Sequence, residues 1–137
     1  MPSSRELTGV SWECVHFLAG ELSAQDMAAL EATGAIVKRA DVSDCRDKSA
    51  LLRSVARGLG LPNYFGENWD ALDECLVDLE GALESALVLS LRGAGAIWRR
   101  LPLESGRLVE SWLTAAETWA RDGKAFHLVF EDVAERP

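Results

Sequence analysis

Carboxylates are the side chains whose number and spacing in this sequence could do chemistry. Between Arg57 and Arg92 there is no lysine, arginine or histidine, and the acidic residues of that segment are Glu67, Asp70, Asp73, Glu74, Asp78, Glu80 and Glu84. The chain has 22 acidic and 14 basic residues, so nearly all of its net charge of -8 arises from this one quarter. Such a segment attracts a cation or a basic protein, whereas nucleic-acid binding needs the opposite charge.

The acids have a helical arrangement that leaves two interpretations open. On a helix beginning near Asn68, the acids expected on one side, with Asp73 adjacent, are Glu67, Asp70, Glu74 and Asp78. Acids one turn apart are unsuited to straddle a sugar as a glycosidase pair, and the D-x-[DN]-x-[DN]-G pattern of a calcium loop is absent. What remains is a solvated face, with Asp70 complementing the helix dipole, or a surface that inserts acids into a basic pocket of another protein.

Signatures of catalysis and cofactor binding are missing from the sequence. His16 and His127 each fall in a predicted strand, where a histidine commonly fills a sheet position, and no GxSxG turn is present. The cysteines and histidines are too scattered for a zinc site, and neither a P-loop nor a GxGxxG motif occurs. The sequence therefore predicts a protein that is not an enzyme and has no cofactor and no metal.

Hydrophobic periodicity predicts the elements that position these acids. Strands are expected at residues 10–18, 35–40, 86–91 and 125–130. Helices are expected at residues 24–33, 48–59, 69–81 and 107–121, with a short helical connector at 96–100. Residues 86–91 are apolar on both faces, which is typical of a parallel strand covered by helices. Alternating strands and helices indicate an α/β fold with a parallel sheet.

Length and composition place further limits on the protein. A chain of 137 residues suits one domain, and its longest apolar run, residues 86–91, is far shorter than the ~20 residues of a membrane span. The N-terminus lacks the basic and apolar regions of a secretion signal. The three cysteines form no CxxC pair, which suits a reducing compartment. We therefore expect a cytoplasmic protein without a membrane segment.

One continuous motif resembles a known family. Residues 59–76 read LGLPNYFGENWDALDECL, which is similar to the barstar-family signature L-P-x-Y-[FY]-G-x-N-x-D-A-L-x-[DE]-C-[LI]. A looser similarity in the order of elements runs over residues 35–131. The resemblance implies a single barstar-like domain over residues 1–137, with a core at 35–131, three layers and a parallel three-stranded sheet. Residues 1–34 would form an N-terminal βα extension that lengthens the sheet if its strand joins it.

The resemblance also implies a function and a binding site. It implies an intracellular inhibitor that plugs the active site of a small secreted guanyl-type ribonuclease in a 1:1 complex. Tyr64 would pack on the catalytic histidine of the ribonuclease, Asp70 would pair with a basic residue of its substrate-recognition loop, and Glu74 would occupy its phosphate site. The implied partner-binding positions are Tyr64, Gly66, Asn68, Trp69, Asp70, Asp73, Glu74, Asp78 and Glu117.

The sequence departs from the founding member of that family in three ways. Glu74 stands where that member has aspartate, Asp73 where it has tryptophan, and Asp78-Leu79 where it has a Gly-Trp pair. These departures leave a second function open: an immunity protein or regulatory adaptor of the same fold, directed at a different toxin or basic protein.

Overall fold

The computed structural model describes residues 7–133, apart from residues 12, 62–66 and 84. The described strands are β1 (Val15–Phe17), β2 (Ile36–Asp41), β3 (Leu87–Arg92) and β4 (Phe126–Phe130). The helices are α2 (Ala24–Ala32), α3 (Lys48–Leu59), α4 (Trp69–Ala82), α5 (Ala94–Arg100) and α6 (Pro102–Arg121). The predicted alternation of strands and helices is confirmed over this part of the chain.

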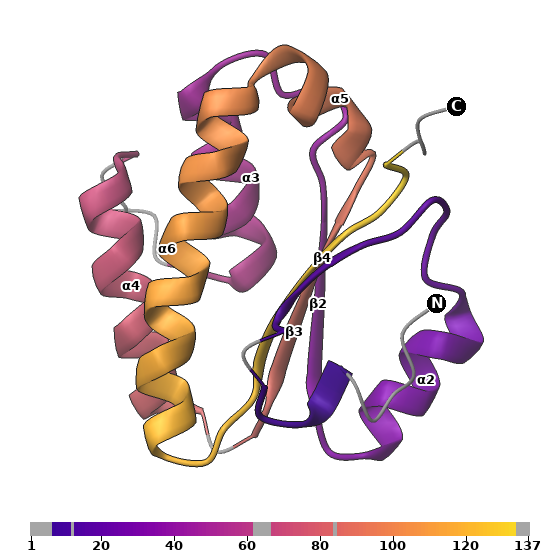
Figure 1. Ribbon diagram of the computed structural model, residues 1–137, viewed down its shortest axis with the longest axis vertical. Coiled ribbons are helices and arrows are strands. Elements are labelled where there is room, and N and C mark those ends of the chain that lie inside the picture. Colours follow the sequence, from indigo (N-terminus) through magenta and orange to yellow (C-terminus); the bar gives the residue numbers. More distant parts are fainter. Residues whose placement is uncertain (1–6, 12, 62–66, 84, 134–137) are drawn as a thin grey trace.

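The four strands form one parallel sheet in the order β1-β4-β3-β2 (Figure 1). The α/β fold with a parallel sheet is therefore confirmed, but the sheet has four strands rather than the expected three. The fourth is β1, whose Val15 and Phe17 pair with Leu128 and Phe130. This strand covers only part of the expected residues 10–18, and it places the N-terminal segment at the edge of the sheet.

Helices cover both faces of the sheet, giving three layers. Helices α3, α4 and α6 lie on one face and α2 lies on the other (Figure 1). Along β3 the side chains alternate, so that Leu87, Leu89 and Leu91 belong to the larger core beneath α3, α4 and α6, whereas Val88 belongs to the smaller core beneath α2. This alternation explains why residues 86–89 are apolar at consecutive positions.

Aromatic rings of α6 anchor that helix to the sheet. The rings of Trp112 and Trp119 stack on Phe126 of β4, with centroids 3.8 Å and 4.2 Å away, and all three side chains are buried. The Trp112 Nε1 donates to the Phe126 carbonyl at 3.1 Å, so its polar atom is satisfied inside the core. Helix α6 is therefore firmly anchored to the sheet and can support another helix packed against it.

The boundaries of several helices differ from the sequence-based expectation. Ser23 and Asp26 form the expected capping box of α2, and Asp47 caps α3 through a bond to the Ala50 amide. By contrast, α6 begins at Pro102 rather than at residue 107, because proline has the backbone angle of a first helical turn and needs no amide partner there. The connector α5 begins at residue 94 rather than 96, and α4 continues one residue past Gly81.

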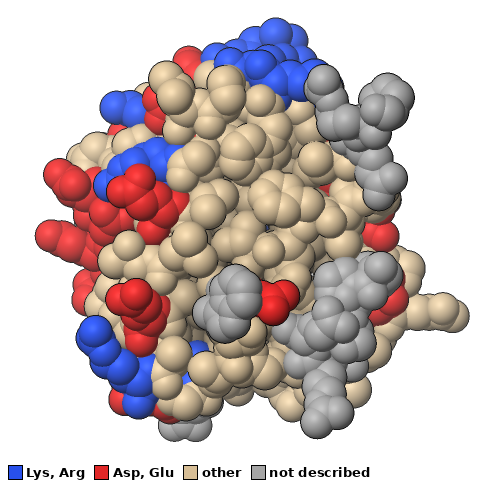
Figure 2. Space-filling model, in the orientation of Figure 1, with Lys and Arg blue, Asp and Glu red and all other residues tan. Residues whose placement is uncertain are grey.

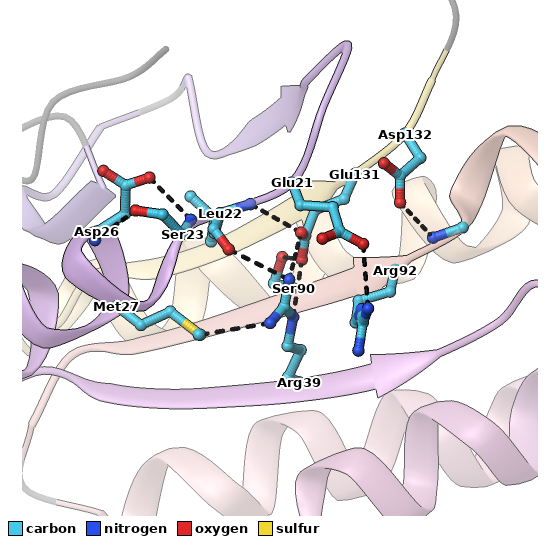
Figure 3. Close-up of polar contacts among 11 residues, drawn as sticks. Glu21, Leu22, Ser23, Asp26, Met27, Arg39, Ser90, Arg92, Glu131 and Asp132 are labelled. Atoms are coloured by element: carbon cyan, nitrogen blue, oxygen red, sulfur yellow. Dashed lines mark hydrogen bonds and ion pairs between the residues drawn. The ribbon is translucent and has the colours of Figure 1, made fainter.

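A buried ion pair joins the N-terminal extension to the sheet (Figure 3). Glu131, which is fully buried just after β4, accepts hydrogen bonds from Arg39 on β2 at 2.7 Å and from the Leu22 amide at 2.8 Å. The Ser90 hydroxyl of β3 donates to its other carboxylate oxygen. Arg39 also donates to the Leu22 carbonyl at 3.3 Å and lies 3.8 Å from the Met27 sulfur of α2. The extension is therefore attached to the sheet through its backbone as well as by apolar packing.

A pair of histidines attaches the residues before β1 to β4. The Nδ1 of the buried His127 lies 2.8 Å from Nε2 of His16, and its Nε2 lies 2.8 Å from the Gly9 carbonyl. Because a carbonyl only accepts, Nε2 of His127 carries the proton and its Nδ1 accepts from His16. Burial lowers the pKa of His127, although its bond to Gly9 acts in the opposite direction.

This pKa shift predicts a loss of stability in mild acid. Below the ordinary histidine pKa of about 6.5 the unfolded chain takes up a proton that folded His127 resists, so the free energy of unfolding falls by up to ~1.4 kcal/mol per pH unit. Urea unfolding between pH 7.5 and 5 measures this slope. His127→Gln, whose amide can still donate to Gly9, should flatten it; an unchanged slope in that variant would contradict the assignment.

Candidate functional site

Helix α4 begins at a side-chain cap. The Asn68 side chain accepts a hydrogen bond from the Ala71 amide at 2.8 Å, and helical geometry starts at Trp69. The preceding residue, Glu67, has a left-handed backbone with φ 52°. Glu67 therefore lies outside the helix, and the expectation that it shares a helix side with the other acids is wrong. Its carboxylate instead lies 3.4 Å from Arg53 of α3.

The N-terminal half of α4 is held against α6 by polar contacts. The Trp69 indole donates to Glu104 at 3.0 Å, and Arg107 bonds Asp73 at 3.0 Å. The same guanidinium lies 5.5 Å from the centroid of the Trp69 ring and donates to Ser111 at 2.6 Å. Trp69 and Asp73, two of the implied partner-binding residues, are thus engaged within the protein.

The C-terminal half of α4 is held by α6 and the turn after it. The Leu76 carbonyl accepts a bond from the buried Trp119 indole at 3.0 Å. Lys124 donates to the Glu80 carbonyl at 3.0 Å and lies 3.4 Å from the Glu80 carboxylate. A hydrogen bond with Asp122, followed by burial, raises the pKa of Glu80. The contacts at residues 69, 73, 76 and 80 place one face of α4 against α6 and the turn that follows it.

The acids of α4 fall into two groups. Asp73 and Glu80 pair with Arg107 and Lys124. The exposed acids of α4 that form no ion pair with any residue the structure describes, hereafter called the acidic stripe, are Asp70, Glu74 and Asp78. The partition shows which carboxylates are still available to another molecule.

The acidic stripe follows a regular geometry. Its members are four residues apart, so at 1.5 Å rise per residue each step advances ~6 Å and the stripe spans ~12 Å. Asp70 and Glu74 each follow a residue held by α6, and one residue turns the helix by ~100°, so the stripe is directed away from α6. Figure 2 shows acidic side chains gathered on the left of the molecule, where Figure 1 places α4.

Chemically, the carboxylates of the stripe can accept hydrogen bonds from cationic groups. Like charges one turn apart repel, at a cost of a few tenths of a kcal/mol to the helix. A cationic surface would remove that repulsion. Within the described ranges, no group of three or more His, Cys, Asp or Glu side chains is placed to hold a metal ion. No described helix is long and apolar enough to cross a membrane.

The other implied partner-binding positions are distributed differently. Tyr64 and Gly66 lie outside the described residues. Asn68 is exposed at the start of α4, next to the stripe. Glu117 is exposed on α6 but lines a separate groove of about 620 Å³ together with Val10 and Cys14 of the N-terminal segment. The structure therefore groups Asn68 with the stripe and places Glu117 beside the N-terminal segment.

Two residues that hold the site were missed by the sequence analysis. Glu104 and Arg107 bond Trp69 and Asp73, but the expected start of α6 at residue 107 left Glu104 outside the helix. Pro102, one of the best markers of a first helical position, is the signal that would have extended α6. With that start, Glu104, Arg107 and Ser111 fall at i, i+3 and i+7, one polar face of the helix.

The fold and the site define a class of protein: a three-layer α/β domain that presents unpaired carboxylates on one helix. Residues 35–131, which are 97 of the 137 residues, match the family model described as Barstar (barnase inhibitor). The chain belongs to the barstar family. No curated protein matches the sequence.

Proposed function

We propose that this protein is a cytoplasmic, non-enzymatic inhibitor of a small barnase-type ribonuclease, which it binds 1:1 by inserting the acidic stripe into the active site. The observation that carries the proposal is the stripe itself, three exposed carboxylates that form no ion pair with any described residue, on a barstar-family scaffold. Glu74 is its central member, Asp70 lies at its N-terminal end, and Asp78 extends it toward the C-terminal end of α4.

The chemistry of a ribonuclease active site supports this choice of partner. Such a site binds phosphate and so presents convergent cationic donors, which bond carboxylates strongly. A carboxylate fixed on a helix can take the place of phosphate but offers no bond to cleave. The net charge of -8 would also accelerate the encounter with a cationic cleft at low salt.

A second candidate keeps the fold and changes the partner. Asp73 is engaged with Arg107, and Asp78 lengthens the stripe to ~12 Å. A stripe of this length also suits a basic groove on a different toxin, for which the protein would be an immunity protein or adaptor. Inhibition of ribonucleases separates the two candidates.

A titration of the protein into barnase and other small guanyl-specific ribonucleases tests the proposal. RNA cleavage is followed with the nuclease well above the expected dissociation constant, and we expect activity to fall linearly to zero at one equivalent. Glu31→Ala, which removes an exposed acid of α2 on the other side of the sheet, should give the same break. No inhibition of any nuclease, including one encoded by the same organism, would favour the second candidate.

A further inference from the structure

We propose that Arg107 is a positioning residue for the acidic stripe: it holds the N-terminal half of α4 against α6, and so directs Asp70 and Glu74, without itself touching the partner. The inference rests on the proposed function and deepens it. It identifies the residue on α6 that prepares the binding helix before the partner arrives.

Arg107 makes contacts in three directions. Its Nη2 bonds Asp73 at 3.0 Å, its Nη1 donates to the buried Ser111 hydroxyl at 2.6 Å, and its guanidinium lies 5.5 Å from the Trp69 ring centroid. Ser111 belongs to the face of α6 that packs inward. The guanidinium of Arg107 is thus held by Ser111 of α6 and contacts two residues of α4 that lie one turn apart.

The orientation of Asp73 supports a role inside the protein. Its Oδ2 is bound by Arg107, and its Oδ1 is shielded from solvent without a hydrogen-bond partner among the described residues. The Asp73 side chain is 36% exposed, but its one oxygen without a hydrogen bond is the shielded one. Asp73 therefore points into the contact between α4 and α6, and its charge is used there.

The two halves of α4 differ in what holds them. The C-terminal half is fixed by Trp119 through Leu76 and by Lys124 through Glu80. The N-terminal half carries Asp70 and Glu74, and its polar attachment to α6 consists of the contacts of Glu104 and Arg107. Leu72 anchors this half in the core. Losing Arg107 would still loosen its polar attachment to α6, so the carboxylates would have to be ordered more fully during binding, which weakens a complex.

Electrostatics and positioning predict opposite results when the Arg107 charge is removed. Removing a cation beside the stripe makes the surface more acidic, so a purely electrostatic role predicts faster association with a cationic cleft and tighter binding. A positioning role predicts faster dissociation and weaker binding. The sign of the change in affinity therefore identifies the role.

Stopped-flow measurement of the complex with an inhibited barnase-type ribonuclease provides the test. Arg107→Met keeps an apolar side chain over Trp69 but loses the bonds to Asp73 and Ser111, and we expect dissociation to become ~3- to 10-fold faster, the scale of one exposed ion pair plus one cation–π contact. The matched control is Arg121→Met, which removes the same charge from an exposed position of α6. Arg107→Lys, which can still pair with Asp73, should lie between wild type and Arg107→Met.

Amide hydrogen exchange gives a second readout that needs no partner. Amides at residues 73–76 should exchange faster in Arg107→Met than in wild type or Arg121→Met, while amides of β3 and β4 stay unchanged. Unchanged exchange in α4 together with an unchanged or slower dissociation rate would overturn the positioning role. If no nuclease is inhibited by wild type, the proposed function fails and exchange alone decides whether Arg107 holds α4.

Discussion

Replacing both Asp70 and Glu74 by alanine is expected to abolish inhibition while leaving the protein folded. Each substitution removes the partner of cationic groups that the complex desolvates. The cost is about 2–5 kcal/mol for each, a general range drawn in part from the barnase–barstar complex itself. Taken singly, each substitution should therefore weaken binding by ~30-fold or more, mainly through faster dissociation. Inhibition titrations and stopped-flow dissociation measure the loss.

The folded state of the double variant separates lost binding from lost structure. Asp70 and Glu74 are exposed and repel one another across one helical turn, so their removal relieves a few tenths of a kcal/mol. Removing Asp70 from the first turn of α4 also loses a favourable interaction with the helix dipole, of similar size. The two effects therefore nearly cancel. Urea unfolding should therefore show a free energy within ~0.5 kcal/mol of wild type.

A charge-matched control completes this experiment. Glu31→Ala combined with Glu110→Ala also removes two exposed acids, one from α2 and one from α6, and neither belongs to the stripe. It should slow association slightly through weaker steering and leave dissociation unchanged. Full inhibition by the Asp70 and Glu74 double variant would refute the assignment of the site.

Local signals in the sequence predicted most of the fold. Ser23, Asp47 and Asn68 each have a side chain that satisfies an orphan amide at a helix start, and each caps the helix expected of it. The largely apolar run at residues 86–91 predicted a strand covered on both faces, because alternate side chains enter different cores. These predictions succeeded because the interactions concerned span only a few residues.

Non-local pairing was the part that the sequence did not reveal. Strand β1 is only three residues long, and it joins the sheet by pairing with β4 more than a hundred residues later. In the same way, helical spacing located the acids of α4, but it could not show that Arg107 and Lys124 neutralise Asp73 and Glu80. Which carboxylates remain unpaired depends on how α6 packs, and no local pattern records this.

Glu131 shows the same dependence on distant residues, and its replacement is expected to have the largest effect on stability. Its buried carboxylate is bound by Arg39, Ser90 and the Leu22 amide, which come from three parts of the chain. In Glu131→Ala these donors lose their acceptor, and Arg39, only a quarter exposed, keeps a charge without its partner. Breaking a buried ion pair in this way costs about 3–5 kcal/mol. That is a large part of the free energy of unfolding of a typical protein, which is about 5–15 kcal/mol. Urea unfolding measures it.

A double replacement distinguishes the ion pair from simple loss of packing. In Arg39→Met combined with Glu131→Leu, both charges are replaced by apolar groups, so the free energy of unfolding should recover much of what Glu131→Ala loses. The smaller core beneath α2, with Val88 and Val129, would receive the new side chains. If the double variant is as unstable as Glu131→Ala, the cost lies in the unpaired Leu22 amide or in packing, not in the uncompensated charge of Arg39. Glu131 lies across the sheet from α4, so in either variant the folded fraction should inhibit as wild type does.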